Sequence, residues 1–569
     1  MCGIVATFNG DLFEPLKQLQ NRGYDSAGVS FVLDNTIECI KYASTQSRSA
    51  IEMLNIPDVE CGIGHTRWAT HGAKTDTNAH PHISNDGKFH LVHNGIIENY
   101  LELKMFLMNH GYTFKSDTDS EVIVNLIQHL YTGSIMDTIN MINTMLTGSW
   151  AICVLLIENN EPVICGTRCG SPLLVGKKGM IVSEMSGFCD RENEYLILDE
   201  LDVVLCKANG PQLQRDYEFI QLDRSQCITL SPSFNHWTIQ EIYEQAESSI
   251  KSVIIDGRID KNTGMVKLEG LDMNESVLRN IDNLILVGCG TSLNVALFAK
   301  RYFTTFNTVQ VINASEFDVV DVPKIGKTAM ILISQSGETR DTYNCLTLAK
   351  SMGVFTMGVI NVRNSLIARE VDCGCYTNVG KENGVASTKS FTGQAIVLYL
   401  MAMWLSRTIL TQINFYNDIR ATLQHHDYIK SYITPMLDNC NSCFILGKGQ
   451  NYALAREGAL KIKEISYIHA EAYELSELKH GPLALLTNDT VVIIIGDDEI
   501  DNCYHEVISR GSSVIVVTNS YKCDNRIHVP SSNKLLYVIP LQLLAYECSL
   551  RRGLNPDMPR NLAKVVTVA

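Results

Sequence analysis

The sequence predicts a protein of mixed α/β and α+β class, with a layered α+β domain first and two tandem doubly wound lobes after it. Three observations support this prediction. Short strand-like runs, turns and two helical patterns fill roughly residues 1–230. Beyond about residue 280, fully apolar strand runs alternate with helical stretches, as in parallel sheets covered on both faces. This second pattern then restarts, which indicates an internal repeat of ~150 residues.

In the first domain, residues 89–93 and 151–157 are strand-like, and residues 98–108 and 120–130 show helical patterns. Residues 231–278 are polar and helical in pattern, which predicts a linker with lead-in helices.

The predicted strands of the first lobe are residues 284–287, 329–333 and 356–360, and residues 444–449, 491–495 and 514–517 are their counterparts in the second. Because both series open on a strand followed by a Gly-x-Gly turn, we expect lobes over residues 279–425 and 435–555. Residues 556–569 remain as a C-terminal tail.

Composition narrows the class of protein. The chain has 569 residues, 45% of them apolar and 19% charged, as in ordinary soluble proteins with several domains. The 62 acidic residues outnumber the 47 Lys and Arg, which disfavours general binding to nucleic acid. The longest apolar run, residues 395–405, is too short to span a membrane, and no signal peptide is evident. We therefore expect a cytoplasmic protein that keeps its 18 cysteines reduced.

Cys2 is the first candidate catalytic residue. Removal of Met1 would leave Cys2 with a thiol of pKa about 8.5 beside an α-amine of pKa about 7.7–8. One residue would then supply both a nucleophile and a base. The simpler alternative is that Cys2 is only an early residue of the first strand.

Three further clusters lie at residues 22–28, at residues 64–72, and at residues 93–99 with 116–121, and with Cys2 they have the chemistry to bind and cut an amino-acid amide. Arg67, in residues 64–72, has a guanidinium fork suited to an α-carboxylate, and Asp119 suits an α-ammonium group. Asn94 and Gly95 offer a side-chain N–H and a backbone N–H for an oxyanion. Each cluster also has a plain structural interpretation, such as a turn for Asn-Gly.

In this order from residue 2, the clusters resemble the class II, N-terminal nucleophile (Ntn) glutamine amidotransferases. The resemblance implies an Ntn-type α-β-β-α sandwich. It implies that Cys2 is the nucleophile and that its own amine is the base. The other implied roles are an oxyanion hole at Asn94 and Gly95, glutamine binding by Arg67, Thr70, His71 and Asp119, and an ammonia-channel gate at Trp68.

A second candidate site begins where residues 329–333 run into a hydroxyl-rich turn. Ser334, Gln335, Ser336 and Thr339 surround a glycine, and a helix is predicted to start near Thr339. Hydroxyl and backbone N–H donors at a helix N-terminus suit a phosphate group. An ordinary Ser-rich helix cap is the alternative.

Both lobes resemble SIS (sugar isomerase) domains, and the whole chain resembles the isomerizing glutamine–fructose-6-phosphate aminotransferases. In a helical run predicted over residues 457–474, Lys461 and Glu464 lie on one helix face, where a surface ion pair is the alternative. The resemblance implies that Glu464 carries the isomerising proton, His480 opens the sugar ring and Lys564 forms a Schiff base. The implied sugar-phosphate contacts are Ser292, Ser334, Gln335, Ser336, Thr339, Val385, Ser387, Lys461 and Ala563.

The resemblance implies two substrates, glutamine and fructose 6-phosphate, and a glucosamine 6-phosphate product. It implies no metal, no organic cofactor, a tail that covers the sugar site, and a homodimer whose sugar site takes His480 from the neighbouring subunit. We expect no nucleotide-sugar inhibition, because regulated relatives carry extra sequence in the glutaminase half.

Two rival functions remain from sequence. One is an amidotransferase for another phosphosugar, and the other is a non-enzymatic phosphosugar sensor. A sensor would not need Cys2, Glu464, His480 or Lys564. Cys440 and Cys443 form the one C-x-x-C pair, which we interpret as core packing because no second pair or histidine stands at zinc spacing.

Overall fold

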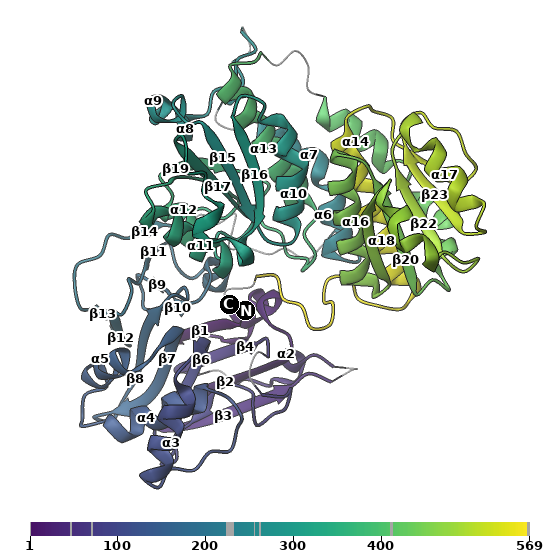
Figure 1. Ribbon diagram of the computed structural model, residues 1–569. Helices are drawn as coiled ribbons and strands as arrows, with labels where there is room; N and C mark the ends of the chain where they lie inside the picture. The colour runs from purple at the N-terminus through teal and green to yellow at the C-terminus, as the bar shows by residue number, and fades with distance from the viewer. Residues whose placement is uncertain are drawn as a thin grey trace. The chain divides into compact units, whose positions relative to one another are not determined.

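The computed structural model describes residues 2–8, 10–45, 48–57, 59–69, 72–222, 233–254, 257–260, 263–409 and 414–565 (Figure 1). The chain divides into two compact units. Residues 1–231 together with residues 563–569 form the first unit, and residues 232–562 form the second. Each unit has its own sheets and its own apolar cores.

The first unit is built on two antiparallel sheets. One has eight strands in the order β14-β11-β9-β10-β1-β4-β2-β3, and the other has six in the order β13-β12-β8-β7-β6-β5. The eight strands are β1 (Gly3–Phe8), β2 (Ser26–Leu33), β3 (Thr36–Ala43), β4 (Cys61–Arg67), β9 (Leu174–Gly176), β10 (Ile181–Val182), β11 (Glu194–Ile197) and β14 (Ile220–Gln221). The six are β5 (His82–Ile83), β6 (His90–Ile97), β7 (Gly148–Glu158), β8 (Glu161–Cys169), β12 (Val203–Lys207) and β13 (Gly210–Leu213).

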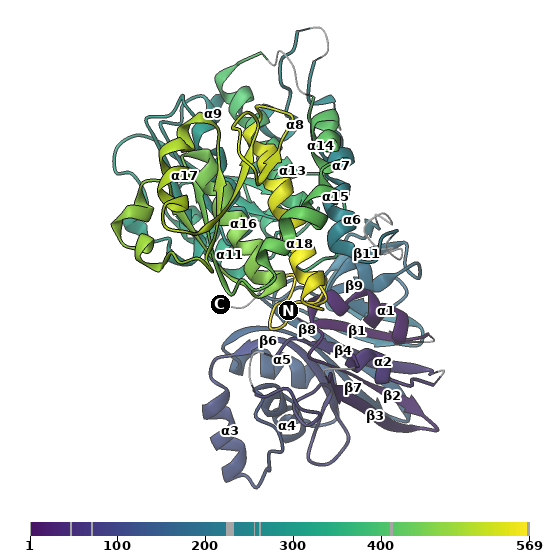
Figure 2. The same ribbon diagram turned by 90° about the vertical axis from the view of Figure 1, so that its right-hand side faces the viewer.

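Buried side chains join these sheets face to face. Ile4 and Ile63 of the first sheet share a core with Val92 and Ala151 of the second. The second sheet's outer face packs on α3 (Tyr100–Asn109), α4 (Ser120–Leu130) and α5 (Ile135–Met145). On the first sheet's outer face lie α1 (Phe13–Gln18) and α2 (Ala50–Met53), on the side opposite α3–α5 (Figure 2). These layers confirm the predicted α-β-β-α sandwich.

The second unit holds two parallel five-stranded sheets with one strand order. The orders β16-β15-β17-β18-β19 and β21-β20-β22-β23-β24 are both 2-1-3-4-5 in chain order, a doubly wound arrangement. The first lobe has β15 (Asn283–Gly288), β16 (Thr308–Asn313), β17 (Thr328–Ser334), β18 (Phe355–Ile360) and β19 (Cys373–Tyr376). The second has β20 (Ser442–Gly447), β21 (His469–Glu474), β22 (Val491–Ile495), β23 (Ser513–Thr518) and β24 (Arg526–His528).

One apolar core connects these two lobes, because helices from both pack between the sheets (Figure 1). They are α7 (Gln245–Ile254), α10 (Thr291–Ala299), α13 (Lys389–Ser406), α16 (Gln450–Ser466) and α18 (Val538–Arg551). The outer sheet faces carry α11 (Arg340–Ser351) and α12 (Leu366–Glu370) in the first lobe and α17 (Asp501–Ile508) in the second. The remaining helices are α6 (Trp237–Tyr243), α8 (Glu269–Asp272), α9 (Glu275–Leu278), α14 (Phe415–Leu423) and α15 (His426–Tyr428).

The helix predicted over residues 457–474 is wrong at its C-terminal end. The helix α16 stops at Ser466, Tyr467 takes a left-handed conformation with φ 59°, and the chain continues as β21. Ala and Glu in β21 favour a helix by propensity, but parallel pairing with β20 outweighs that preference. As the sheet's edge strand, β21 tolerates the exposed polar residues that made the segment look helical.

Within the described ranges, no helix is long and apolar enough to cross a membrane.

Candidate active sites

The candidate glutaminase nucleophile, Cys2, immediately precedes β1 and is half-buried. Its Sγ lies 3.3 Å from the backbone nitrogen of Trp68, which donates to it from the end of β4. Gly3, the next residue, donates its N–H to Thr66 Oγ1 at 3.1 Å. Burial raises the pKa of the Cys2 thiol, while the Trp68 N–H and Arg67 act to lower it.

Asn94 and Gly95 reach this site from β6. The Asn94 amide donates through Nδ2 to the carbonyl oxygen of Cys2 at 2.8 Å, so the structure brings these two predicted residues together. Gly95 has φ +134°, and a Cβ there would stand 2.0 Å from the carbonyl oxygen of Ser149. Only glycine fits at this position, which explains the Asn-Gly pair inside a strand.

Arg67 and Asp119 are both buried in the first unit, at 4% exposure each. Arg67 ends β4, and its Nη2 lies 3.5 Å from the carbonyl oxygen of Gly72. The Asp119 carboxylate accepts the backbone N–H of Ile97 at 2.9 Å, and this contact fixes it beside β6. Burial lowers the pKa of Arg67, opposed by Cys2, Asp25 and Asp119. The other two predicted glutamine-binding residues, Thr70 and His71, lie outside the described residues.

The sequence interpretation gave no role to a turn that supports these groups. Asp25 accepts the Ala69 N–H at 2.9 Å and lies 3.4 Å from the Lys74 ammonium. A Cβ on Gly23 would stand 2.4 Å from the Arg67 carbonyl carbon, so this turn packs directly under the Arg67–Trp68 peptide. The Arg-Gly-Tyr-Asp run at residues 22–25 was the available signal, but its contact with Arg67 is visible only in the fold.

The second candidate site occupies the first lobe's switch point, between β15 and β17. Ligands bind at such points in doubly wound sheets, at the carboxyl ends of the strands. Ser334 ends β17, and its Oγ accepts the Gly337 N–H at 3.0 Å and lies 3.2 Å from Thr339 Oγ1. Ser336 Oγ accepts the Glu338 N–H at 3.1 Å. Thr339 occupies the N-cap position of α11, which confirms the predicted helix start.

Four more residues predicted to contact the sugar phosphate belong to the first lobe. Ser292 is in the first turn of α10, and its hydroxyl is 3.2 Å from Gln394 Oε1 of α13. Gln335 is half-buried next to Ser334. Val385 is buried and Ser387 half-buried, in the segment that leads into α13.

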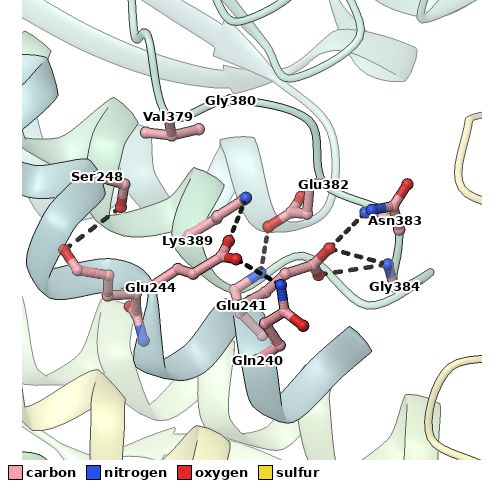
Figure 3. Close-up of polar contacts among 12 residues, drawn as sticks. Gln240, Glu241, Glu244, Ser248, Val379, Gly380, Glu382, Asn383, Gly384 and Lys389 are labelled. Carbon is pink, nitrogen blue, oxygen red and sulfur yellow. Dashed lines mark hydrogen bonds and ion pairs between the residues drawn. The ribbon is translucent and has the colours of Figure 1, made fainter. Parts of the chain in front are cut away.

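Two buried carboxylates hold the segment before α13 (Figure 3). Glu241 of α6 accepts the backbone N–H groups of Asn383 and Gly384. Glu382 accepts the N–H groups of Thr388 at 2.9 Å and Ser390 at 3.1 Å. Because both carboxylates act on backbone donors on either side of Val385 and Ser387, they fix this loop's shape.

Lys461 and Glu464 lie on one face of α16, as predicted, but they are not a surface pair. The Lys461 side chain is 2% exposed, and its Nζ lies 2.6 Å from Glu464 and 3.4 Å from Glu457. Burial would lower the pKa of Lys461, but the two carboxylates outweigh it and raise the pKa to about 12. Glu457 also accepts from Thr291 at 3.0 Å and Asn294 at 2.8 Å, so α16 of the second lobe is tied to α10 of the first.

The other predicted catalytic groups belong to other segments of the chain. His480 ends a short 3-10 helix and is exposed. Ala563 and Lys564 are half-buried and belong to the first unit, where the Lys564 N–H donates to the Asn21 carbonyl oxygen at 3.3 Å.

Cys440 and Cys443 are buried, and Cys440 Sγ lies 3.1 Å from the Ser442 carbonyl oxygen. In the part of the chain that the structure describes, no cluster of three or more His, Cys, Asp or Glu is arranged to hold a metal.

Comparison with known proteins covers both units. A glutamine amidotransferase domain model matches residues 65–189, and an SIS domain model matches residues 277–404 and 436–551. A protein of Acanthamoeba polyphaga mimivirus named "Probable glutamine–fructose-6-phosphate aminotransferase [isomerizing]" is 39% identical, with all of both chains covered. The glutamine–fructose-6-phosphate aminotransferase of Chlorobaculum tepidum is 36% identical, again over all of both chains. A solved C-terminal domain of the Francisella tularensis glucosamine-fructose-6-phosphate aminotransferase is 31% identical, with TM-score 0.51, covering 58% of this chain and 100% of that one.

Proposed function

The chain belongs to the isomerizing glutamine–fructose-6-phosphate aminotransferase family, and from that premise we propose which residues carry each step of its reaction. It is an enzyme that converts fructose 6-phosphate and glutamine to glucosamine 6-phosphate and glutamate. The observation that carries this conclusion is full-length identity of 34–39% to relatives of that name, with both kinds of domain present.

Glutamine hydrolysis begins at Cys2 once Met1 has been removed. The Cys2 thiolate attacks the substrate carboxamide carbon, and the α-amine takes the thiol proton and passes it to the departing ammonia. Water then hydrolyses the thioester and releases glutamate. Asn94 and Gly95 stabilise the oxyanion in both steps. The hydrogen bond of 2.8 Å between Asn94 and the Cys2 carbonyl oxygen supports this arrangement.

Arg67 and Asp119 hold the two charged ends of glutamine in this scheme. The guanidinium pairs with the α-carboxylate, and the Asp119 carboxylate pairs with the α-ammonium group. Their burial supports the proposal, because charges in a desolvated site bind ions more strongly than exposed charges do. Thr70 and His71 complete the proposed pocket, and Trp68 gates ammonia transfer.

Fructose 6-phosphate binds through its phosphate to the turn after β17. The hydroxyl groups of Ser334, Ser336 and Thr339 and the Gln335 amide supply donors, and the α11 N-terminus adds a favourable dipole. The other proposed sugar contacts are Ser292, Val385, Ser387, Lys461 and Ala563.

Lys564 condenses with the C2 carbonyl and releases water, and ammonia then displaces the lysine to give an imine at C2. Glu464 moves a proton from C1 to C2, which completes the ketose-to-aldose change. The Lys461 ammonium, 2.6 Å from Glu464, supports this role because it orients the carboxylate. His480 protonates the ring oxygen to open the sugar.

We also propose a cytoplasmic homodimer in which His480 enters the partner subunit's sugar site. Its exposure in one chain supports this role. Every described cysteine is a free thiol, which is in keeping with a reducing compartment.

The test is product analysis on purified enzyme. With glutamine and fructose 6-phosphate, the wild type should form glucosamine 6-phosphate and glutamate, and Cys2→Ala should form neither from glutamine. Release of glutamate without aminosugar by the wild type would show that the acceptor sugar is wrong. Activity of Cys2→Ala equal to the wild type would remove the nucleophile assignment.

A further inference from the structure

Four buried histidines lie together in the first unit. His65 is on β4, His82 is on β5, His93 is on β6 and His80 lies two residues before the start of β5. Each is 4% exposed or less. The rings of His65 and His80 stack at 4.1 Å between centroids, and His80 meets His82 edge-on at 4.6 Å. None of the four was assigned a role from the sequence.

Of these histidines, His65 makes a direct contact with the proposed oxyanion hole. Its Nε2 lies 3.0 Å from Asn94 Oδ1 and 3.1 Å from the backbone oxygen of His93. The opposite end of the Asn94 amide, Nδ2, donates to the Cys2 carbonyl oxygen. Asn94 is therefore held between His65 and the nucleophile residue.

Two backbone carbonyl oxygens determine the orientation of these groups. The His93 carbonyl only accepts, so His65 Nε2 carries the hydrogen and donates it. The Cys2 carbonyl only accepts, so the end of the Asn94 amide facing Cys2 is the NH₂ group and the end facing His65 is the oxygen. Burial lowers the pKa of His65 to about 3, so the ring is neutral with its single hydrogen on Nε2.

We propose that His65 is a positioning residue for glutamine hydrolysis, which fixes the Asn94 amide so that an N–H of Nδ2 faces the oxyanion. Without a donor at His65, the amide could rotate and present its oxygen to the developing negative charge. A carbonyl oxygen there would repel the charge that the NH₂ group stabilises. This inference rests on the glutaminase function proposed above.

Through Ser120, one of these histidines is also connected to Asp119, the group proposed to bind the substrate's ammonium. His93 Nδ1 lies 2.9 Å from Ser120 Oγ, which donates to Asp119 Oδ1 at 3.4 Å. The backbone N–H of His93 donates to His80 Nδ1 at 3.2 Å. One buried cluster thus supports both Asn94 and Asp119.

Two substitutions at residue 65 test the proposal by separating the hydrogen bond from packing. His65→Leu removes the donor and replaces the ring with an apolar side chain of similar bulk. His65→Gln returns an N–H donor near the position of Nε2. We expect His65→Leu to lower kcat for glutamate release about 10–100-fold with little change in KM, and His65→Gln to recover most of that loss.

His90→Leu is the matched control. His90 is a buried histidine on the same strand as Asn94, and its Nδ1 lies 2.8 Å from Ser30 Oγ rather than near Asn94. Loss of stability alone should affect His65→Leu and His90→Leu alike, as thermal unfolding would show. Alkylation of Cys2 by iodoacetamide reports whether the nucleophile is intact in each variant.

A double mutant gives the sharpest result. If His65 acts through Asn94, then His65→Leu should lower kcat little further in an Asn94→Ala background. Fully multiplicative effects, or equal losses of kcat in His65→Leu and His90→Leu, would overturn the proposal. Absence of glutamate release by the wild type would instead overturn the glutaminase function itself.

Discussion

The two lobes of the second unit share one backbone plan and use it differently. Both sheets have the strand order 2-1-3-4-5, and in both lobes the first strand leads through a glycine into a helix. Gly290 before α10 has φ 53° and ψ −124°, and Gly449 before α16 has φ 61° and ψ −118°. The repeat thus extends to individual backbone angles.

The difference lies in the turn after the third strand. In the first lobe, Ser334 ends β17 and Ser336 follows it, and both have neutral hydroxyl groups. In the second lobe, Asp497 follows β22, and its carboxylate accepts from Thr518 at 2.7 Å, Ser520 N–H at 2.9 Å and Tyr537 at 2.9 Å. These donors are committed to a protein carboxylate, and its negative charge would repel a phosphate.

The comparison indicates that the two lobes have different roles in the proposed sugar site. The first lobe has the turn proposed to bind phosphate at its switch point. In the second lobe, the Asp497 carboxylate occupies the equivalent turn. Glu457, Lys461 and Glu464 lie instead on α16, the helix after the first strand of that lobe. The hydrogen bonds that Thr291 and Asn294 of the first lobe donate to Glu457 connect the two lobes.

The largest expected effect is on the chemistry of the second lobe. Glu464→Gln keeps the side chain's size but removes the group proposed to move a proton between C1 and C2. We expect glucosamine 6-phosphate formation to fall about 10²–10⁴-fold, the range for loss of a general acid or base. Glutamate release with saturating fructose 6-phosphate is the control. Product formation at the wild-type rate would contradict the division of roles.

A smaller effect is expected at the turn of the first lobe. Ser336→Ala should raise KM for fructose 6-phosphate about tenfold, because a hydrogen bond to a charged group contributes ~1.5–3 kcal/mol. Thr518→Ala is the matched change at the second lobe's turn and should leave this KM unaltered. Steady-state kinetics on both variants measures KM for fructose 6-phosphate. Equal KM values in Ser336→Ala and Thr518→Ala would contradict the proposed difference between the two turns.

The smallest effect is on the stability of the second lobe. The donors around Asp497 outweigh its burial and hold the pKa of its carboxyl below the ordinary value. The stabilisation from Asp497 is therefore complete above the unfolded-state pKa of about 3.9 and is lost as pH falls towards the folded-state pKa. Asp497→Asn should cost about 1 kcal/mol at pH 7, and the deficit should shrink below about pH 4. Hydrogen exchange of the β22 and β23 amides measures this loss of stability in Asp497→Asn. A loss that does not change with pH would contradict this account.

Sequence predicted the fold class because apolar strand runs and repeated Gly-x-Gly turns are local signals. It was wrong over residues 467–474, where pairing along β20 outweighed helical propensity. Motifs in the sequence predicted the candidate functional clusters, but they did not predict the residues that hold these clusters in place. Glu241 contacts Asn383 and Gly384 across more than a hundred residues, and no local pattern in α6 indicates this. His65 lies inside a predicted motif, yet its hydrogen bond to Asn94 depends on how β4 and β6 meet.

The most direct test of the central claim follows the nitrogen atom. The enzyme is given glutamine labelled with ¹⁵N in its amide, fructose 6-phosphate and an excess of unlabelled ammonium, and the glucosamine 6-phosphate is analysed by mass spectrometry. If the chain couples hydrolysis at Cys2 to synthesis at the sugar site, the product carries ¹⁵N and forms in step with glutamate. Unlabelled product, or glutamate without aminosugar, would contradict that claim.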